Sequence, residues 1–437
     1  MKNKYYLLFI VAAFYIFIES SAFLVNNTYY KNKIKVTYDS RYFQNLKKQI
    51  QNLSKDELLN ISSVDFKNKI IDLKYYELSN LDIKRDFLKY FDDTFSYTPY
   101  RELISNSFSS KNLNINEYGF RGTKFSLKKK NPKDFRILMF GSSALFGWPN
   151  SSDNETISSY LQDILNKKIN QENKNIENYE VLNLSVKSYN AIQDYINYLI
   201  VSQFIEHDMV IIYNGHNDFN DGFFGNGVSY SKMIEKQGAF KDYYDAVRSK
   251  NHNLFFKQGF YYLNYKVKKY LQNLFNFTFR NSYKFLKNIK SNDKISKNKN
   301  LVLNGENSIS TRKSYGEIIE KWFKLLASLE KDVVYIHQVN LFATNKEKSF
   351  WEKLWTDFGR NKNFYTNFDL NKYKNLYLNQ MKFANNIAEK NKTKFINIEN
   401  KIKYLKKDVN IFFDHTHLTN KGNRFVAQEI ANLVLKY

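Results

Sequence analysis

The sequence predicts an α/β fold in which helices cover both faces of a five-stranded parallel sheet. Five short runs rich in apolar and β-branched residues follow one another along the chain, and a segment with helical periodicity comes after each of them. The runs are mostly apolar, as expected of strands that are buried on both faces. With 437 residues, of which 43% are hydrophobic, the chain is long enough to build such a core.

The order of the expected elements indicates where a functional site would lie. The strands are expected at residues 135–140, 180–184, 209–213, 333–337 and 394–398. The helices are expected at residues 155–169, 191–204, 315–329, 373–390 and 421–435. This alternation is typical of a doubly wound sheet, in which the ligand crevice lies at the carboxyl ends of the strands.

Two connections are longer than the loops usual in such folds. Residues 220–313 separate the third strand from the next helix and form an insertion beside the expected crevice. A lid or docking surface and a solvated elaboration are both open interpretations of it. A second insertion at residues 340–370 contains Trp351 and Trp355 and is expected to flank the same crevice.

The N-terminus carries an apolar stretch at residues 5–25 that follows Lys2 and Lys4. About 20 such residues span a bilayer as a helix, and basic residues ahead of them favour a cytoplasmic N-terminus. We therefore expect residues 1–25 to be a single-pass transmembrane helix in the cytoplasmic membrane, with the rest of the chain on the extracytoplasmic (periplasmic) side. A cleaved signal sequence stays open, because the small residues at 20–22 resemble a cleavage site.

The chain divides into three expected parts: the anchor or signal sequence at 1–25, a stalk or accessory region at 26–115, and the main domain at 116–437. Its net charge is +24, but the positive charge is spread along the sequence. A dedicated nucleic-acid binder would gather that charge on one face, so no nucleic-acid partner is expected. The absence of Cys excludes disulfides, thiolate catalysis and Cys-based zinc sites.

A serine follows the first expected strand. The sequence FGSSALFG at 140–147 places Ser143 on the turn between this strand and a helix. Such a turn exposes a hydroxyl while neighbouring backbone N–H groups point into the crevice, which suits nucleophilic attack. A phosphate-binding P-loop does not fit, because Gly147 is followed by Trp148 and Pro149 instead of Lys and Ser or Thr. Alone, the turn is a weak signal, since small residues cap many helices.

A carboxylate and a histidine precede the last expected helix. Asp414 and His417 are close enough in sequence for the carboxylate to accept the imidazole Nδ1–H and to leave Nε2 facing a nucleophile. The only long-range contact then required is that of His417 with Ser143. His415 and His417 resemble a metal pair but lack a third ligand at a supporting spacing, so no metal and no cofactor is expected.

Four blocks of the sequence resemble the SGNH (GDSL-like) hydrolase superfamily, over the chain from Asn116 onward. In order, the matching positions are Ser143 in the Gly-Ser-Ser block, Asn183 in the Asn-x-Gly-x-x-Gly block, Gly215, Asn217 and Asp218 in the Gly-x-Asn-Asp block, and Asp414 and His417 in the Asp-x-x-His block. The resemblance implies a three-layer, flavodoxin-like domain with Ser143, His417 and Asp414 as catalytic triad.

The second block departs from the family pattern, because both of its glycines are serines here, Ser185 and Ser188. The resemblance implies an oxyanion hole built from the backbone N–H of Ser143, the backbone N–H of Ser185 and the side-chain amide of Asn217. Ser185 donates in this way only where its φ and ψ are tolerated by a residue with a side chain.

The stretch NEYGFRG at 116–122 looks like a segment that precedes the catalytic domain in many bacterial membrane-associated members of the family. Arg121 within it has two open interpretations, a substrate-binding cation and a structural ion pair.

The function that the resemblance implies is a membrane-anchored serine ester hydrolase, that is, an acylhydrolase or esterase, with carbohydrate O-deacetylation included. The expected partners are an acyl ester substrate, such as an acylated glycan, and the membrane. An O-acyltransferase acting on a surface polysaccharide stays open, because the same acyl-enzyme serves both outcomes. A non-catalytic glycan-binding or assembly protein on the same scaffold also stays open, because of the two replaced glycines.

Overall fold

The computed structural model describes residues 40–53, 64–91, 95–98, 102–122, 125–172, 175–223, 308–359 and 369–436. The expected membrane anchor at 1–25 lies outside these residues, as does most of the first insertion. Among the helices that are described, none is both long and apolar enough to cross a membrane.

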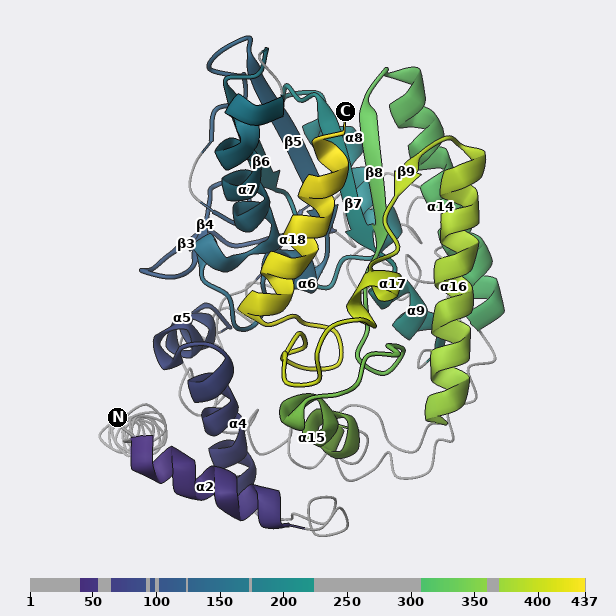
Figure 1. The fold of residues 1–437 in the computed structure, drawn as a ribbon. Coiled ribbons are helices and arrows are strands. Elements are labelled where there is room, and N and C mark those ends of the chain that lie inside the picture. The colour runs from purple at the N-terminus through teal and green to yellow at the C-terminus, as the bar shows by residue number, and fades with distance from the viewer. Residues whose placement is uncertain are drawn as a thin grey trace, which may run out of the picture. The chain divides into compact units, whose positions relative to one another are not determined.

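The centre of the fold is the five-stranded parallel sheet that the sequence predicts (Figure 1). Its strands are β5 (Asp134–Gly141), β6 (Asn178–Asn183), β7 (Met209–Asn214), β8 (Asp332–His337) and β9 (Lys394–Phe395). Their order across the sheet is β6-β5-β7-β8-β9, so β5, the first strand of this sheet along the chain, lies second, and the chain winds away from it in both directions. This is the flavodoxin-like strand order.

The last strand is shorter than expected. It covers only Lys394–Phe395, whereas the sequence predicts a strand up to residue 398. The chain instead begins helix α17 (Ile398–Ile402), because the side chain of Asn397 accepts a hydrogen bond from the backbone N–H of Asn400 and caps that helix. At an edge of the sheet, a local cap therefore outweighs the extended pattern of the residues.

Helices cover both faces of the sheet. They are α7 (Ile157–Glu172), α8 (Ala191–Val201), α14 (Ser308–Ser328), α16 (Leu370–Lys390) and α18 (Asn420–Val434). Alternate residues of β5 enter different cores, as the side-chain alternation of a strand requires. Ile137 and Met139 pack with α7 and α18, and Leu138 and Phe140 pack with α8, α14 and α16. In Figure 1, α18 crosses in front of the sheet and α8 lies behind it.

Three short helices lie at the carboxyl ends of the strands. They are α6 (Ser143–Phe146) after β5, α9 (His216–Phe223) after β7, and α15 (Phe350–Gly359) within the second insertion. Trp351 of α15 is buried, with 3% of its surface exposed, and its indole N–H donates to Glu77 Oε2 at 2.6 Å. The second insertion is therefore joined to the region that precedes the sheet.

The region that precedes the sheet contains helices and two small hairpins. Its elements are α2 (Ser40–Asn52), α4 (Val64–Leu78), α5 (Leu81–Phe91), the pair β1 (Phe95–Thr98) and β2 (Glu102–Ser105), and the pair β3 (Phe108–Ser109) and β4 (Asn114–Ile115). Phe87 of α5 packs edge-on against Trp148, with ring centres 5.0 Å apart. Tyr75 of α4 packs against Phe413 at 4.9 Å. Helix α5 thus contacts the loop after Ser143, and helix α4 contacts the loop that carries Asp414.

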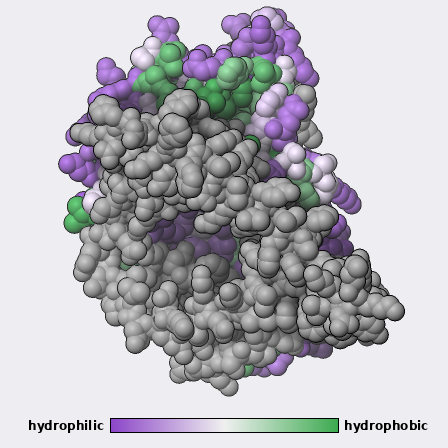
Figure 2. All heavy atoms as spheres, turned by 180° about the vertical axis from the view of Figure 1, so that it is seen from behind, coloured by the Kyte–Doolittle hydropathy of each residue, from purple (hydrophilic) through white to green (hydrophobic). Residues whose placement is uncertain are grey.

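Apolar side chains also reach the surface in places. Figure 2, which shows the molecule from behind, has a hydrophobic area among hydrophilic residues along the upper edge of the described part. Phe204 after α8 and Leu329 after α14 are among the exposed apolar residues, at 65% and 47%. Single exposed apolar residues are ordinary at protein surfaces.

Candidate active site

Ser143 is the first residue of α6, directly after the end of β5. Ser142 before it is extended, and Gly147 after the helix has φ 83°, in the left-handed region, so the chain turns sharply at both ends. The backbone N–H groups in the first turn of a helix have no partner within it. They lie beside the Ser143 hydroxyl and are suited to bind an anion that forms there.

The structure brings the three residues of the expected triad together. The distance from Ser143 Oγ to His417 Nε2 is 2.9 Å, and the distance from His417 Nδ1 to Asp414 Oδ2 is 2.7 Å. An ionised carboxylate only accepts hydrogen bonds, so Nδ1 carries the proton and Nε2 is the acceptor for the serine O–H. This is the geometry in which an imidazole can take a proton from the serine during attack.

Asp414 is held as an acceptor by its surroundings. Its Oδ1 accepts the backbone N–H groups of Thr416 at 2.9 Å and His417 at 2.8 Å. Burial alone raises the pKa of Asp414, but the charges of His417, His415 and Lys74 and the hydrogen bond from His417 outweigh it and hold this pKa well below its usual range. The carboxylate therefore stays ionised throughout the range in which esters are hydrolysed enzymatically.

Two side chains from other elements fix the loop that carries this pair. Glu352 of α15 accepts the backbone N–H groups of Ile411 at 2.9 Å and Phe412 at 3.2 Å, just ahead of Asp414. Gln338, at the end of β8, donates to Thr416 Oγ1 at 2.6 Å. Sequence reasoning missed both residues. Gln338 directly follows a strand and was detectable on that ground, whereas nothing in the sequence around Glu352 marks it.

Glu352 is itself part of a buried ion pair. Its Oε2 lies 2.8 Å from Lys346 Nζ, and both side chains are fully buried. The same oxygen accepts the backbone N–H of Ser349 at 2.9 Å. The contacts that this carboxylate accepts come from backbone N–H groups and from Lys346. Its role is therefore to support the loop.

The second block places its two serines in different backbone conformations. Ser188 takes the left-handed φ of 68° at the second glycine position, whereas Ser185 is not among the residues with positive φ. Ser185 is fully buried, and its backbone N–H donates to Asn183 Oδ1 at 3.2 Å. Its hydroxyl also donates to that oxygen. The expected oxyanion donor of Ser185 is therefore engaged with Asn183 in this structure.

The third block lies at the end of β7, next to β5. Asn217 is in the first turn of α9, and its Nδ2 donates to Tyr189 O at 2.7 Å, which uses one of its two amide hydrogens. Gly215 has φ 103°, and a Cβ there would approach His337 Nε2 to 2.7 Å, so this position requires glycine. Asp218 accepts the backbone N–H of Ala191 with both oxygens at 3.2 Å and supports the start of α8.

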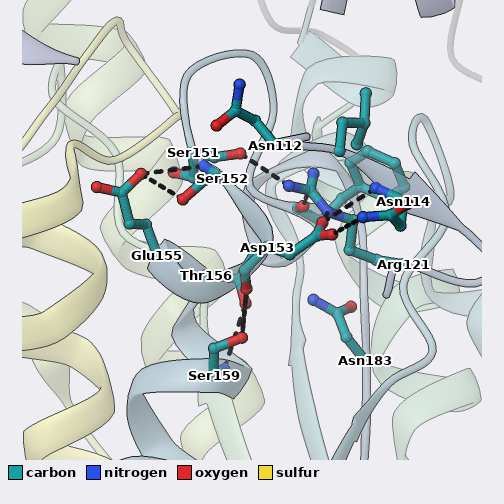
Figure 3. Close-up of polar contacts among 12 residues, drawn as sticks. Asn112, Asn114, Arg121, Ser151, Ser152, Asp153, Glu155, Thr156, Ser159 and Asn183 are labelled. Carbon is teal, nitrogen blue, oxygen red and sulfur yellow. Dashed lines mark hydrogen bonds and ion pairs between the residues drawn. The ribbon is translucent and has the colours of Figure 1, made fainter. Parts of the chain in front are cut away.

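Arg121 is a structural residue in the part of the chain that is described (Figure 3). Its side chain is 2% exposed, and its Nε lies 2.6 Å from Asp153 Oδ1. Its two terminal nitrogens donate to Phe146 O at 3.0 Å and Ser151 O at 2.8 Å. Asp153 also accepts from Asn114 Nδ2 at 2.7 Å. Of the two open interpretations of Arg121, this geometry matches the structural ion pair. The contacts of Arg121 join α6 to the loop that follows it.

His415 lies beside the triad without joining it. Its ring stacks on Phe342, with centres 5.6 Å apart and planes at 15°, and lies 5.5 Å from the ring of His216. Burial lowers the pKa of His415 to about 4, with Asp414 acting in the opposite direction. Among the described residues, no group of three His, Asp or Glu is placed to hold a metal ion.

Comparison with solved structures finds matches at low sequence identity and low TM-score. No family model and no curated protein matches the chain. Among solved structures, the acetyl xylan esterase AlAXEase is 13% identical, with a TM-score of 0.33 over 69% of this chain and 100% of that one. The lipase/acylhydrolase from Enterococcus faecalis is 12% identical, with a TM-score of 0.34 over 69% and 96%. Axe2, an acetylxylan esterase from Geobacillus stearothermophilus, is 10% identical, with a TM-score of 0.36 over 71% and 96%.

The fold can be assigned from the chain's own features. The strand order places β5 next to β7, Ser143 directly follows β5, and the Asp-x-x-His pair directly precedes the last helix. The Gly-x-Asn-Asp block lies at the end of β7, at the same edge of the sheet as the serine. The chain therefore has a flavodoxin-like α/β fold, and its sequence blocks lie where the resemblance to SGNH hydrolases predicts them.

Proposed function

We propose that this protein is a serine ester hydrolase whose catalytic triad is Ser143, His417 and Asp414. The observation that carries the proposal is the continuous chain of contacts from Ser143 Oγ to His417 and from His417 to Asp414, at 2.9 and 2.7 Å. Two residues that are 274 positions apart in sequence meet at hydrogen-bond distance at the carboxyl edge of the sheet.

The proposed reaction proceeds through an acyl-enzyme on Ser143. Ser143 Oγ attacks the acyl carbonyl while His417 Nε2 takes its proton, and the imidazolium is stabilised by Asp414. The leaving alcohol receives that proton and leaves Ser143 acylated. Water then attacks the acyl-enzyme, with His417 again taking the proton and returning it to Ser143, and the acid is released. The oxyanion is bound by the backbone N–H of Ser143 and by Asn217 Nδ2. Ser185 N–H also donates to the oxyanion once it has given up its hydrogen bond to Asn183 Oδ1.

The decisive experiment is covalent labelling of the nucleophile. A fluorophosphonate reacts with an activated serine, so the wild type should be labelled and Ser143→Ala should not. Ser142→Ala is the matched control, because this serine precedes Ser143 in the same turn and its hydroxyl contacts Gln338 Oε1 at 3.5 Å. Hydrolysis of p-nitrophenyl acetate should follow the same pattern. A folded wild type that is neither labelled nor active would favour a non-catalytic glycan-binding or assembly protein.

We propose an acylated glycan as the substrate class, on the basis of the motif resemblance alone. Release of acetate from acetylated oligosaccharides, compared with release from a simple acetyl ester, tests this. Transfer would appear in the same assay as acetyl groups that move from a donor to an oligosaccharide hydroxyl instead of to water. Partition wholly to water supports the hydrolase, and partition to the sugar supports an O-acyltransferase.

We also propose that residues 1–25 anchor the protein in the cytoplasmic membrane, with the catalytic domain on the periplasmic side. The support is the apolar stretch at 5–25 and the basic residues ahead of it. The full chain should fractionate with membranes and require detergent for extraction. A chain recovered in the aqueous phase with its N-terminus intact would contradict the anchor, and a chain shortened near residue 22 would indicate a cleaved signal sequence.

A further inference from the structure

Lys187 belongs to the second block of the sequence, and its side chain is buried against three aromatic rings. Its Nζ lies 4.1 Å from the centre of the Tyr90 ring, 4.2 Å from that of Trp148 and 5.6 Å from that of Phe146. Lys187 is 6% exposed. An ammonium group at such distances is attracted to the faces of aromatic rings. The three rings, which we call the aromatic cage, therefore hold the end of this side chain.

The aromatic cage is built on two elements that flank the nucleophile. Tyr90 lies in α5, in the region that precedes the sheet, and Phe146 lies in α6, the short helix that begins with Ser143. The rings of Tyr90 and Phe146 stack with centres 6.3 Å apart and planes at 13°. Both belong to one buried apolar cluster, against which Trp148 also packs. The side chain of Lys187 thus joins the loop after β6 to α5 and to α6.

The backbone of this loop runs beside the turn of the nucleophile. The backbone N–H of Val186 donates to Gly141 O at 3.2 Å, two residues before Ser143. Ser185, the residue before Val186, carries the backbone N–H that the motif resemblance implies as an oxyanion donor. The position of the loop therefore determines where the N–H of Ser185 lies relative to Ser143.

The loop adopts a conformation that its own residues do not favour. Ser188, directly after Lys187, has φ 68°, in the left-handed region that residues with a side chain rarely adopt. Such a conformation persists where the surrounding structure holds it. The motif that this block resembles has glycine at the position of Ser188, and glycine meets no such cost. The contacts of Lys187 in the aromatic cage are suited to hold the loop in this conformation.

A second cation, Arg121, fixes one wall of the aromatic cage. Its guanidinium carbon lies 5.1 Å from the centre of the Phe146 ring, and its Nη1 donates to Phe146 O at 3.0 Å. Arg121 is itself paired with Asp153. Burial lowers the pKa of Lys187 to about 7, and the charge of Arg121 acts in the same direction. The ammonium form of Lys187, which the rings attract, is therefore present at neutral pH.

We propose that Lys187 is a positioning residue for the oxyanion hole, whose side chain in the aromatic cage holds the N–H of Ser185 beside Ser143. Without this contact the loop is less constrained, and the N–H is less often at the place where the oxyanion forms. The loss falls on the transition state, since the oxyanion exists only there and in the tetrahedral intermediate. The inference deepens the ester-hydrolase function proposed above and rests on it.

The first test separates kcat from KM in the hydrolysis of p-nitrophenyl acetate. Lys187→Met removes the ammonium group and keeps the length of the side chain, whereas Lys187→Arg keeps a cation. We expect Lys187→Met to lower kcat about tenfold with little change in KM, which is less than the roughly 10²- to 10³-fold cost of losing an oxyanion donor. Lys187→Arg should restore most of kcat. Lys111→Met, at an exposed lysine between β3 and β4, is the matched control and should equal the wild type.

A second measurement addresses the oxyanion hole directly. Phenylboronic acid adds to a nucleophilic serine and forms a tetrahedral anion with an oxygen at the position of the oxyanion. Its inhibition constant should rise in Lys187→Met about as much as kcat falls, because the same donors bind both. The inhibition constant in Lys111→Met should equal that of the wild type.

A matched pair of variants tests the aromatic cage from its other side. Tyr90→Leu removes one ring, and Tyr90→Phe keeps a ring face for the ammonium group. We expect Tyr90→Leu to lower kcat and to weaken the boronic acid in the same direction as Lys187→Met. Tyr90→Phe should stay close to the wild type in both.

Each outcome decides the question. An unchanged kcat and inhibition constant in a folded Lys187→Met, with an active wild type, would overturn the inference and leave the proposed function intact. A higher KM at unchanged kcat would also overturn it. An inactive wild type would refute the proposed function and the inference with it. If Lys187→Met does not fold, the Tyr90 pair decides: a lower kcat in Tyr90→Leu alone supports the inference, and an unchanged kcat overturns it. If Tyr90→Leu does not fold either, the aromatic cage serves stability and the inference is wrong.

Discussion

His415 and His417 lie two residues apart and have different surroundings, so they should respond differently to replacement. His417→Ala removes the base and should abolish most turnover. Asp414→Asn should reduce kcat by on the order of 10⁴-fold, because the amide favours the wrong tautomer of His417. His415→Ala should cost less than about tenfold, since this ring stacks on Phe342 outside the triad. Steady-state kinetics on a single chromogenic ester measure all three, and a loss in His415→Ala equal to that in His417→Ala would contradict the assignment.

At this scale, the sequence predicted the residues whose chemistry and neighbours are local. Asp414 and His417 are three positions apart and form their contact within one turn, and Ser143 is marked by the strand before it. Glu352 was not predictable in the same way. It contacts the loop ahead of Asp414 from an element that is distant in sequence, and a glutamate on an amphipathic helix usually faces solvent.

Helix α15 supports the catalytic loop through a buried charge, which makes it sensitive to loss of that charge. Glu352→Gln leaves Lys346 buried without its partner and weakens the hydrogen bonds to Ile411 and Phe412. We expect the free energy of unfolding to fall by about 3 to 5 kcal/mol. Chemical denaturation of the variant measures this. The double variant Lys346→Met with Glu352→Gln is the control and should recover part of the loss, since it no longer buries an unpaired charge.

Helix α17 contains a carboxyl group whose titration should be visible in stability. Glu399 is 6% exposed, and burial raises its pKa to about 7, although hydrogen bonds from Asn345 and Thr344 act against this. Because the folded-state pKa lies above the unfolded value, its stabilising contribution is complete below about pH 4.5 and is lost as pH rises through 7.

Glu399→Gln should remove this dependence. At pH 8 the variant should be more stable than the wild type by about 2 to 3 kcal/mol, and at pH 4.5 the difference should vanish. Thermal or chemical unfolding at the two pH values measures the effect. A variant that is destabilised equally at both pH values would contradict this expectation. It would show that the hydrogen bond from Asn345 to Glu399 stabilises the fold and that ionisation of Glu399 does not lower the free energy of unfolding.

The elements that the sequence predicted best are those with the strongest apolar pattern. Strands β5, β7 and β8 and helices α7 and α16 lie within a few residues of their expected positions, whereas α14 begins at Ser308, seven residues before its expected start. Tertiary packing and local pattern favour the same state in these strands. The edge strand β9 was overestimated, since the pattern of an edge strand is less constrained than that of a buried one. The contacts of α4 and α5 were not predicted, because neither helix contains a chemical motif.

The molecule as a whole should depend on the region before the sheet. Removal of residues 1–25 should leave the hydrolase active. Removal of residues 1–101 deletes α4 and α5 and exposes apolar side chains such as Phe413 and Trp148. We expect this shorter chain to lose activity and to melt on the order of 10 °C lower. Differential scanning calorimetry and ester hydrolysis on both chains test the difference. Equal activity and melting temperature would show that the region is a detachable stalk.

The strand order also has a consequence for the synthesis of the protein. The nucleophile follows the first strand of the sheet, and the base follows the last one, 274 residues later. At synthesis rates of roughly 5–20 residues per second, a growing chain carries Ser143 for on the order of tens of seconds before His417 has been made. During that time the proposed triad is incomplete, because the residue proposed as its base has not been made. On the proposed function, an incomplete chain therefore lacks the group that activates Ser143.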